Sequence, residues 1–136
     1  MNIVIDSNVL FSALIKDSLT RKIILEYDGQ FLFPSFIFEE MEKHKAELFR
    51  KSGLSQEEFD QLLIFILKKT IIVPTEILYP YRKRALEIIG HIDKDDVLFF
   101  ACALAYLNSF IWSDDKKLKE QSIIRILNTS EMKEVF

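Results

Sequence analysis

Four acidic side chains lie beside apolar segments of the sequence, away from the solvent-facing stretches that hold most of the other acids. They come from four separated parts of the chain: Asp6, Glu40, Asp96 and Asp115. Carboxylates brought close together raise one another's pKa, so such a group needs a cation to be stable. Oxygen ligands select hard ions, and carboxylate-bound Mg²⁺ or Mn²⁺ commonly serves to cut phosphate esters. The pattern therefore indicates metal-dependent phosphate chemistry, provided that the fold brings the four acids together.

Two of these positions directly follow short apolar runs. Asp6 comes after Ile3–Ile5, and the pair Asp114–Asp115 comes after Phe110–Ser113. In open α/β sheets, ligands bind at the carboxyl ends of the strands, where both positions would lie. Helix capping is the alternative explanation at both places, because Asp is a favoured N-cap residue.

Glu40 borders the apolar stripe of a predicted long helix. On a helical wheel, Ile37 and Met41 share a narrow arc, and Glu40 lies beside it with His44 one turn further on. A carboxylate at that position is costly unless it is paired or bound to a metal. Glu39 points away from the stripe, so the wheel selects Glu40 as the candidate ligand. A glutamate that reaches water, or that pairs with a neighbouring base, is the alternative.

Three acids stand within four positions just ahead of the most apolar segment of the chain: Asp93, Asp95 and Asp96. An acid at a helix N-terminus gains roughly 0.3–1 kcal/mol from the helix dipole, which accounts for one or two of them. Asp96 shares a helix face with Phe100, so we expect it to point inward. Asp93 and Asp95 are predicted to cap the helix or to support the metal ligands.

Short apolar runs alternate with longer segments of helical period along the whole chain. Strands are predicted at residues 2–5, 31–33, 70–73, 110–113 and 123–127, and helices at about 9–15, 18–27, 35–51, 55–67, 81–89 and 94–107. The predicted N-terminal caps are Ser18 or Asp17, Ser35, and the capping box Ser55–Glu58. This alternation predicts an α/β fold, a three-layer α/β/α domain around a mainly parallel sheet of four to five strands.

Composition bounds the class of protein. The 136 residues fit one domain, 1–136, and a net charge of −3 argues against nucleic-acid binding by bulk charge, though not by local contacts. The single Cys102 excludes an intrachain disulfide and favours the cytoplasm. Cys102, His44 and His91 lack the spacing of zinc ligands.

The longest apolar run, Val97–Leu107, is too short to span a membrane, and the N-terminus has no signal-peptide pattern.

Four segments, taken in order, resemble the PIN-domain ribonucleases over most of the chain. They are Val4–Val9 (VIDSNV), Ser35–Met41 (SFIFEEM), Asp93–Ala101 (DKDDVLFFA) and Ile111–Leu118 (IWSDDKKL). The length is similar to that of the single-domain prokaryotic members, among them the VapC-type toxins of toxin–antitoxin pairs. One departure is Lys117, which stands where many members carry a further acid.

The resemblance implies an endoribonuclease that depends on Mg²⁺ or Mn²⁺. Its catalytic and metal-binding acids would be Asp6, Glu40, Asp96 and Asp115, and its supporting residues Ser7, Asn8, Asp93, Ser113 and Asp114. Whether Asp114 or Asp115 is the fourth acid stays open. The implied partners are an RNA substrate, an antitoxin if the protein is a toxin, and a second copy in a homodimer.

Two other classes of function stay open. A haloacid-dehalogenase-like phosphatase also begins with Asp after its first strand, but it needs a second Asp where this chain has Asn8. A non-catalytic interaction domain of the same fold is the other, since Phe38 and Phe49 lie on the far side of their helix and would suit contact with a partner. The densest basic run, Arg82–Arg84, could serve either substrate or partner.

Overall fold

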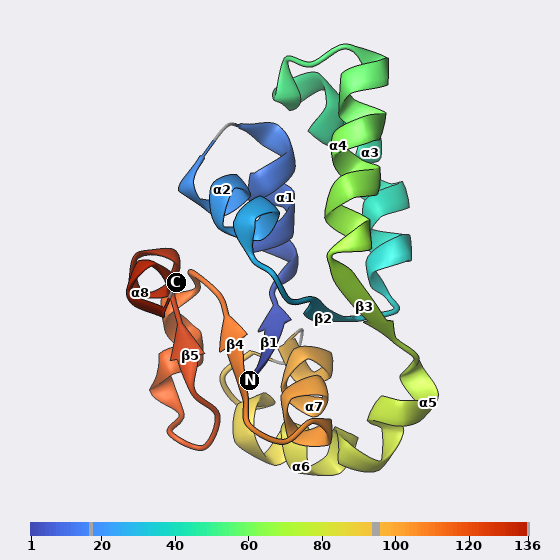
Figure 1. The fold of residues 1–136 in the computed structure, drawn as a ribbon. Helices are drawn as coiled ribbons and strands as arrows, with labels where there is room; N and C mark the ends of the chain where they lie inside the picture. Colours follow the sequence, from blue (N-terminus) through green and yellow to red (C-terminus); the bar gives the residue numbers. More distant parts are fainter. Residues whose placement is uncertain (17, 94–95, 136) are drawn as a thin grey trace.

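Apolar runs of two to four residues form a central sheet of five strands, all of them parallel, in the order β3-β2-β1-β4-β5 (Figure 1). The computed structural model describes residues 1–16, 18–93 and 96–135. The strands are β1 (Asn2–Ile5), β2 (Phe31–Pro34), β3 (Thr70–Val73), β4 (Ser109–Trp112) and β5 (Ile126–Leu127). The order reverses between β1 and β4, and in such sheets ligands bind outside the carboxyl ends of the strands at that reversal.

Helices cover both faces of the sheet, which confirms the predicted three-layer α/β/α fold. The first crossovers supply α1 (Ser7–Ile15), α2 (Leu19–Glu26), α3 (Ile37–Ser52) and α4 (Gln56–Lys68). The return to β4 supplies α5 (Thr75–Leu78), η1 (Tyr79–Tyr81), α6 (Arg82–Ile89) and α7 (Val97–Ala105), and the chain closes with η3 (Lys116–Glu120) and α8 (Thr129–Val135). Helix α7 packs across β1, β2 and β4, with α6 outside it, and α1 and α2 lie on the opposite side (Figure 1).

The core fills both faces of the sheet, one of them beneath α7 and the other beneath α1 and α2. Phe100, Ala101 and Cys102 of α7 are fully buried, as the all-apolar character of this segment predicted. Trp112 of β4 is also fully buried, and its indole N–H donates to the Thr129 hydroxyl at 3.0 Å, which ties α8 to the sheet. Among the described residues, every helix is too short or too polar to cross a bilayer.

Several helix ends follow the predicted signals. The Ser18 hydroxyl accepts from the Arg21 backbone N–H at the start of α2, and Ser55 and Glu58 form the predicted capping box of α4. Helix α3 ends at Gly53, whose φ of 68° is the left-handed conformation that suits glycine. Asp17, the alternative cap, lies outside the described residues, as do Lys94 and Asp95.

Other predicted boundaries are wrong. Ser35 does not cap α3. Its hydroxyl lies 3.4 Å from the Thr75 hydroxyl, its backbone N–H donates to the Val73 carbonyl, and the helix begins at Ile37 without a side-chain cap. The fifth strand is only Ile126–Leu127. Its predicted beginning is a loop in which the Gln121 carboxamide accepts from two backbone N–H groups, those of Ile123 and Ile124.

Further differences concern elements without a clear sequence pattern. The segments α5, η1 and α8 were not predicted, and α7 ends at Ala105, so that Leu107 is exposed. Phe38 is exposed, as expected for a contact residue. Phe49 is not available for a partner, because its ring packs edge-on against Phe59 of α4, with the ring centroids 5.5 Å apart.

Candidate active site

The first and last predicted acids follow the two strands at the reversal of the sheet. Asp6 comes after β1, and its backbone N–H donates to the Trp112 carbonyl at the end of β4, at 3.1 Å. Ser113 is therefore the lateral neighbour of Asp6. Its hydroxyl donates to Asp6 Oδ2 at 2.6 Å and accepts from the Asp115 backbone N–H at 3.1 Å. One buried hydroxyl thus fixes the position of one acid relative to the other.

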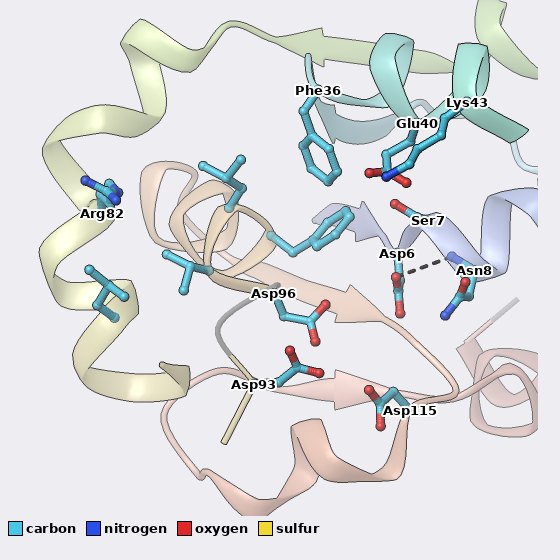
Figure 2. Close-up of a pocket in the computed structure, with 14 residues that line it drawn as sticks. Asp6, Ser7, Asn8, Phe36, Glu40, Lys43, Arg82, Asp93, Asp96 and Asp115 are labelled. Carbon is cyan, nitrogen blue, oxygen red and sulfur yellow. Dashed lines mark hydrogen bonds between the residues drawn. The ribbon is translucent and has the colours of Figure 1, made fainter. Parts of the chain in front are cut away.

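Three carboxylates converge in front of these strand ends. Asp93, Asp96 and Asp115 each offer one oxygen, and the three oxygens lie within 4.8 Å of one another (Figure 2). Asp96 occupies the cap position of α7 but its side chain makes no capping hydrogen bond, so capping does not explain this acid. Asp115 does cap η3, accepting from the Lys117 N–H at 3.0 Å through one oxygen.

The surroundings of this cluster favour the protonated form of two carboxyls, Asp96 and Asp6. Burial, followed by the negative charges of Asp6, Asp93 and Asp115, raises the pKa of Asp96 to about 8. Burial also raises the pKa of Asp6, against the lowering effect of the Ser113 hydroxyl and of the Asn8 backbone N–H. In the part of the chain that the structure describes, no Lys, Arg or His forms an ion pair with Asp6, Asp96 or Asp115.

These observations test whether a metal ion suits the cluster. The donors are carboxylate oxygens alone, which is the chemistry of Mg²⁺ and Mn²⁺ sites, and Cys102 is buried inside α7. A divalent cation would supply positive charge to Asp6, Asp96 and Asp115, which have no ion-pair partner among the described residues. The residues present therefore fit a hard divalent ion.

Glu40 reaches the same region from α3, on the other side of Asp6. Its carboxylate is about one-third exposed and lies 3.6 Å from His44 Nε2, so both the metal-ligand and the base-pairing explanations have a structural counterpart. Glu40 lies outside the compact group of three acids, above Ser7 in Figure 2. Glu39 is exposed, as the helical wheel predicted.

All four predicted acids line one pocket of about 910 Å³ (Figure 2). Two basic side chains also line it, Lys43 from α3 and Arg82 from α6, and neither forms an ion pair among the described residues. The remaining lining residues are Ser7, Asn8, Phe36, Leu86, Asp93, Val97, Leu98 and Phe99. The pocket thus combines an acidic centre with two cations at a distance along its walls.

The supporting residues differ in what they do. Asp114 turns away from the pocket, and its two oxygens accept from the Thr129 backbone N–H and hydroxyl at 2.7 and 2.8 Å. Asp115 is therefore the member of this pair that faces the cluster. The Asn8 backbone N–H donates to Asp6 Oδ1 at 3.4 Å, and the Ser7 hydroxyl is buried without a hydrogen-bond partner among the described residues.

Asp93 is predicted from the sequence only to cap the helix or to support the metal ligands. In the structure its carboxylate lies in the cluster with Asp96 and Asp115. The chain turns tightly after α6, with the Asp93 N–H donating to the Ile89 carbonyl and the Asp96 N–H to the Asp93 carbonyl. The turn brings Asp93 and Asp96, which are three residues apart, to the same side of the chain. Their spacing in the sequence is the signal that could have predicted a joint role, but an acid just before a helix is equally typical of a helix cap.

Comparison with protein families agrees with the pattern of the four motifs. A family model described as the PIN domain matches residues 4–134, which is nearly the entire chain. No curated protein matches the sequence. PIN domains are generally nucleases, so the match indicates a hydrolase acting on nucleic acid.

Proposed function

The chain belongs to the PIN-domain family, and from this premise we propose that it is an endoribonuclease that depends on Mg²⁺ or Mn²⁺. The observation that carries the proposal is the convergence of Asp93, Asp96 and Asp115 on one point, with Asp6 beside them and the pKa of Asp96 raised to about 8. A protein gains nothing in stability from such a cluster unless a cation occupies it.

Asp6, Asp93, Asp96 and Asp115 would hold the metal, and Glu40 would add a donor from the opposite wall. A bound divalent ion would lower the pKa of its water and neutralise charge that develops on the phosphate. All other contributions come from the side chains. The Ser113 hydroxyl orients the Asp6 carboxylate and holds the Asp115 backbone beside it, while the Lys117 backbone N–H orients the Asp115 carboxylate.

Lys43 and Arg82 would hold the RNA in the pocket. Both line it from elements outside the acidic cluster, and both are without an ion-pair partner in the described residues. Their positive charges suit the phosphates on either side of the cleaved bond, and Arg can bind a phosphate through two parallel hydrogen bonds. Phosphate binding at these positions would offset the repulsion between the acidic centre and the RNA backbone.

The proposal is tested by Asp6→Asn and Asp96→Asn. Both keep the side-chain shape, so the fold should persist, while Mn²⁺-dependent cleavage of RNA should fall by more than the roughly 10–100-fold that loss of an outer-shell residue costs. The matched control is Asp60→Asn on α4, because Asp60 only accepts from Gln56 at the surface. Cleavage that survives EDTA, or that is equal in these variants, would contradict the proposal. A phosphatase would instead trap phosphate covalently on Asp6.

We further propose a cytoplasmic homodimer, with an antitoxin as partner if the protein is a toxin. Phe38 supports a protein contact, since its ring is 55% exposed on α3. Light scattering of the wild type and of Phe38→Ser tests the dimer. A monomeric wild type would refute it.

A further inference from the structure

A second hollow, between α1 and α3, adjoins the acidic pocket. Its volume is about 350 Å³, and it shares three wall residues with the pocket: Ser7, Asn8 and Glu40. These three lie together at one end of the acidic pocket, away from Arg82 (Figure 2). A chain of nucleotides that crossed the acidic centre from the Arg82 side would reach this hollow next.

The charges in the second hollow are already matched. His44 lies 3.6 Å from Glu40, and the Lys51 ammonium lies 2.8 Å from the Glu47 carboxylate. All four side chains line the hollow. Among the described residues that line the hollow, the one lysine is paired with Glu47, so a phosphate would meet two carboxylates there and an uncharged group suits the hollow better.

The other walls of the hollow offer aromatic faces and neutral polar groups. The rings of Phe11 and His44 lie 5.8 Å apart at an angle of 59°. Asn8 and Ser12 line the same space with an amide and a hydroxyl, which can donate to or accept from the edge of a flat heterocycle. Aromatic faces stack on any base, whereas polar groups of this kind can distinguish one base edge from another.

We propose that the hollow lined by Phe11, Ser12 and His44 is a subsite for the base of the nucleotide next to the cleaved phosphodiester, and that it sets a base preference at that position. This inference rests on the proposed RNA substrate. In this arrangement the charged and the uncharged parts of the RNA bind in two different regions of the protein. The phosphates follow Lys43 and Arg82 in the acidic pocket, and one uncharged base enters the neutral hollow between α1 and α3.

Binding is tested first, without cleavage. Adenosine, guanosine, cytidine and uridine are titrated into the metal-free full chain, and the NMR signals of the Phe11 and His44 rings and of the Ser12 amide are followed. We expect at least one nucleoside to shift these signals, while ribose 5-phosphate, which has a charge and no base, leaves them in place. The opposite result, in which ribose 5-phosphate shifts these signals and no nucleoside does, would overturn the inference.

Cleavage of a randomised RNA pool, with sequencing of the new ends, is the second test. Ser12→Ala removes the hydroxyl that can hydrogen-bond to a base edge, so the base preference beside the cut should weaken about tenfold. Ser130→Ala is the matched control, because Ser130 is exposed on α8 and lines neither hollow. Thermal melting checks that both variants fold.

The two tests separate this inference from the proposed function. If nucleosides shift the Phe11 signals but the wild type cuts no RNA, the subsite stands and the ribonuclease assignment falls. If the wild type cuts RNA with Mn²⁺, and Ser12→Ala keeps the full base preference, the assignment stands and the subsite is refuted.

Discussion

Removing the charge of Asp96 should stabilise the metal-free protein at alkaline pH. Burial and three acidic neighbours raise the pKa of this carboxyl from an ordinary 3.8 to about 8 in the folded chain. Because the folded state holds the proton more tightly than the unfolded state, Asp96 favours folding at low pH. That contribution is lost as the pH rises from about 4 to about 8. Above this range the folded protein carries a buried charge that Asp96→Asn does not have.

The size of the effect follows from the shift. Each pKa unit corresponds to about 1.4 kcal/mol, so a shift of about four units sets a ceiling of roughly 5–6 kcal/mol. The carboxyl borders an open pocket, and water there screens part of the repulsion. We therefore expect Asp96→Asn to raise the free energy of unfolding by about 2–3 kcal/mol at pH 8.5, with little change at pH 4.

Urea denaturation in EDTA at the two pH values measures the difference. Asp60→Asn, on α4, should stay within about 0.5 kcal/mol of the wild type at both. Saturating Mn²⁺ should reverse the order at pH 8.5, since a ligand at about 1,000 times its Kd adds about 4.1 kcal/mol to a protein that binds it, which exceeds the gain from Asp96→Asn. An Asp96→Asn variant no more stable than the wild type at pH 8.5 in EDTA would refute the reasoning.

Three further predictions follow from the site and from the fold. Asp96 must lose its proton to bind a cation, so the apparent affinity for Mn²⁺ should rise by about tenfold per pH unit from pH 6 to pH 8 and then level off. Calorimetry in buffers of different ionisation enthalpy counts the proton that is released. A Mn²⁺ affinity that does not change with pH would contradict the raised pKa. Asp114→Ala removes both acceptors of Thr129 and should cost about 1–2 kcal/mol. Amide exchange in residues 129–135 should quicken while Mn²⁺ binding persists, and lost binding would mean that Asp114 acts in the site. Gly53→Ala should lower the free energy of unfolding by about 1 kcal/mol, because a φ of 68° disfavours any residue with a Cβ. No atom lies within 4 Å of the added Cβ, so the cost comes from the backbone conformation alone. Thermal unfolding measures it, and an unchanged stability would show that the turn adapts.

The parts of the fold that the sequence predicts are those governed by local patterns. The apolar runs before Asp6 and before Asp114 form β1 and β4, and the parallel sheet places their carboxyl ends side by side. The capping box at Ser55 requires only side chains three residues apart. In each case the interaction that fixes the structure is short in sequence, or it follows from the rule that parallel strands end at one edge.

The errors share a different cause, which is competition from distant partners. Ser35 is a favoured type of helix-cap residue, but its hydroxyl pairs with the Thr75 hydroxyl, which lies 40 residues away in the chain. Phe49 lies on the outer face of α3, but its ring packs against Phe59 of α4, while Phe38 on the same face stays exposed. Neither partner is visible in the local pattern, so helix periodicity alone could not decide these positions.

The acidity of the chain acquires a different meaning once the acids are placed in space. A net charge of −3 argues against attraction to nucleic acid only if the charges are spread evenly, and here at least four acids line one pocket. One bound divalent ion would change the formal charge from −3 to −1 by adding two units, and a second would bring it to +1. RNA approaching the loaded pocket would meet Lys43 and Arg82 with the acidic centre neutralised. Affinity for RNA should therefore depend on the metal, which a binding measurement in EDTA and in Mn²⁺ would detect as the loss or gain of the complex.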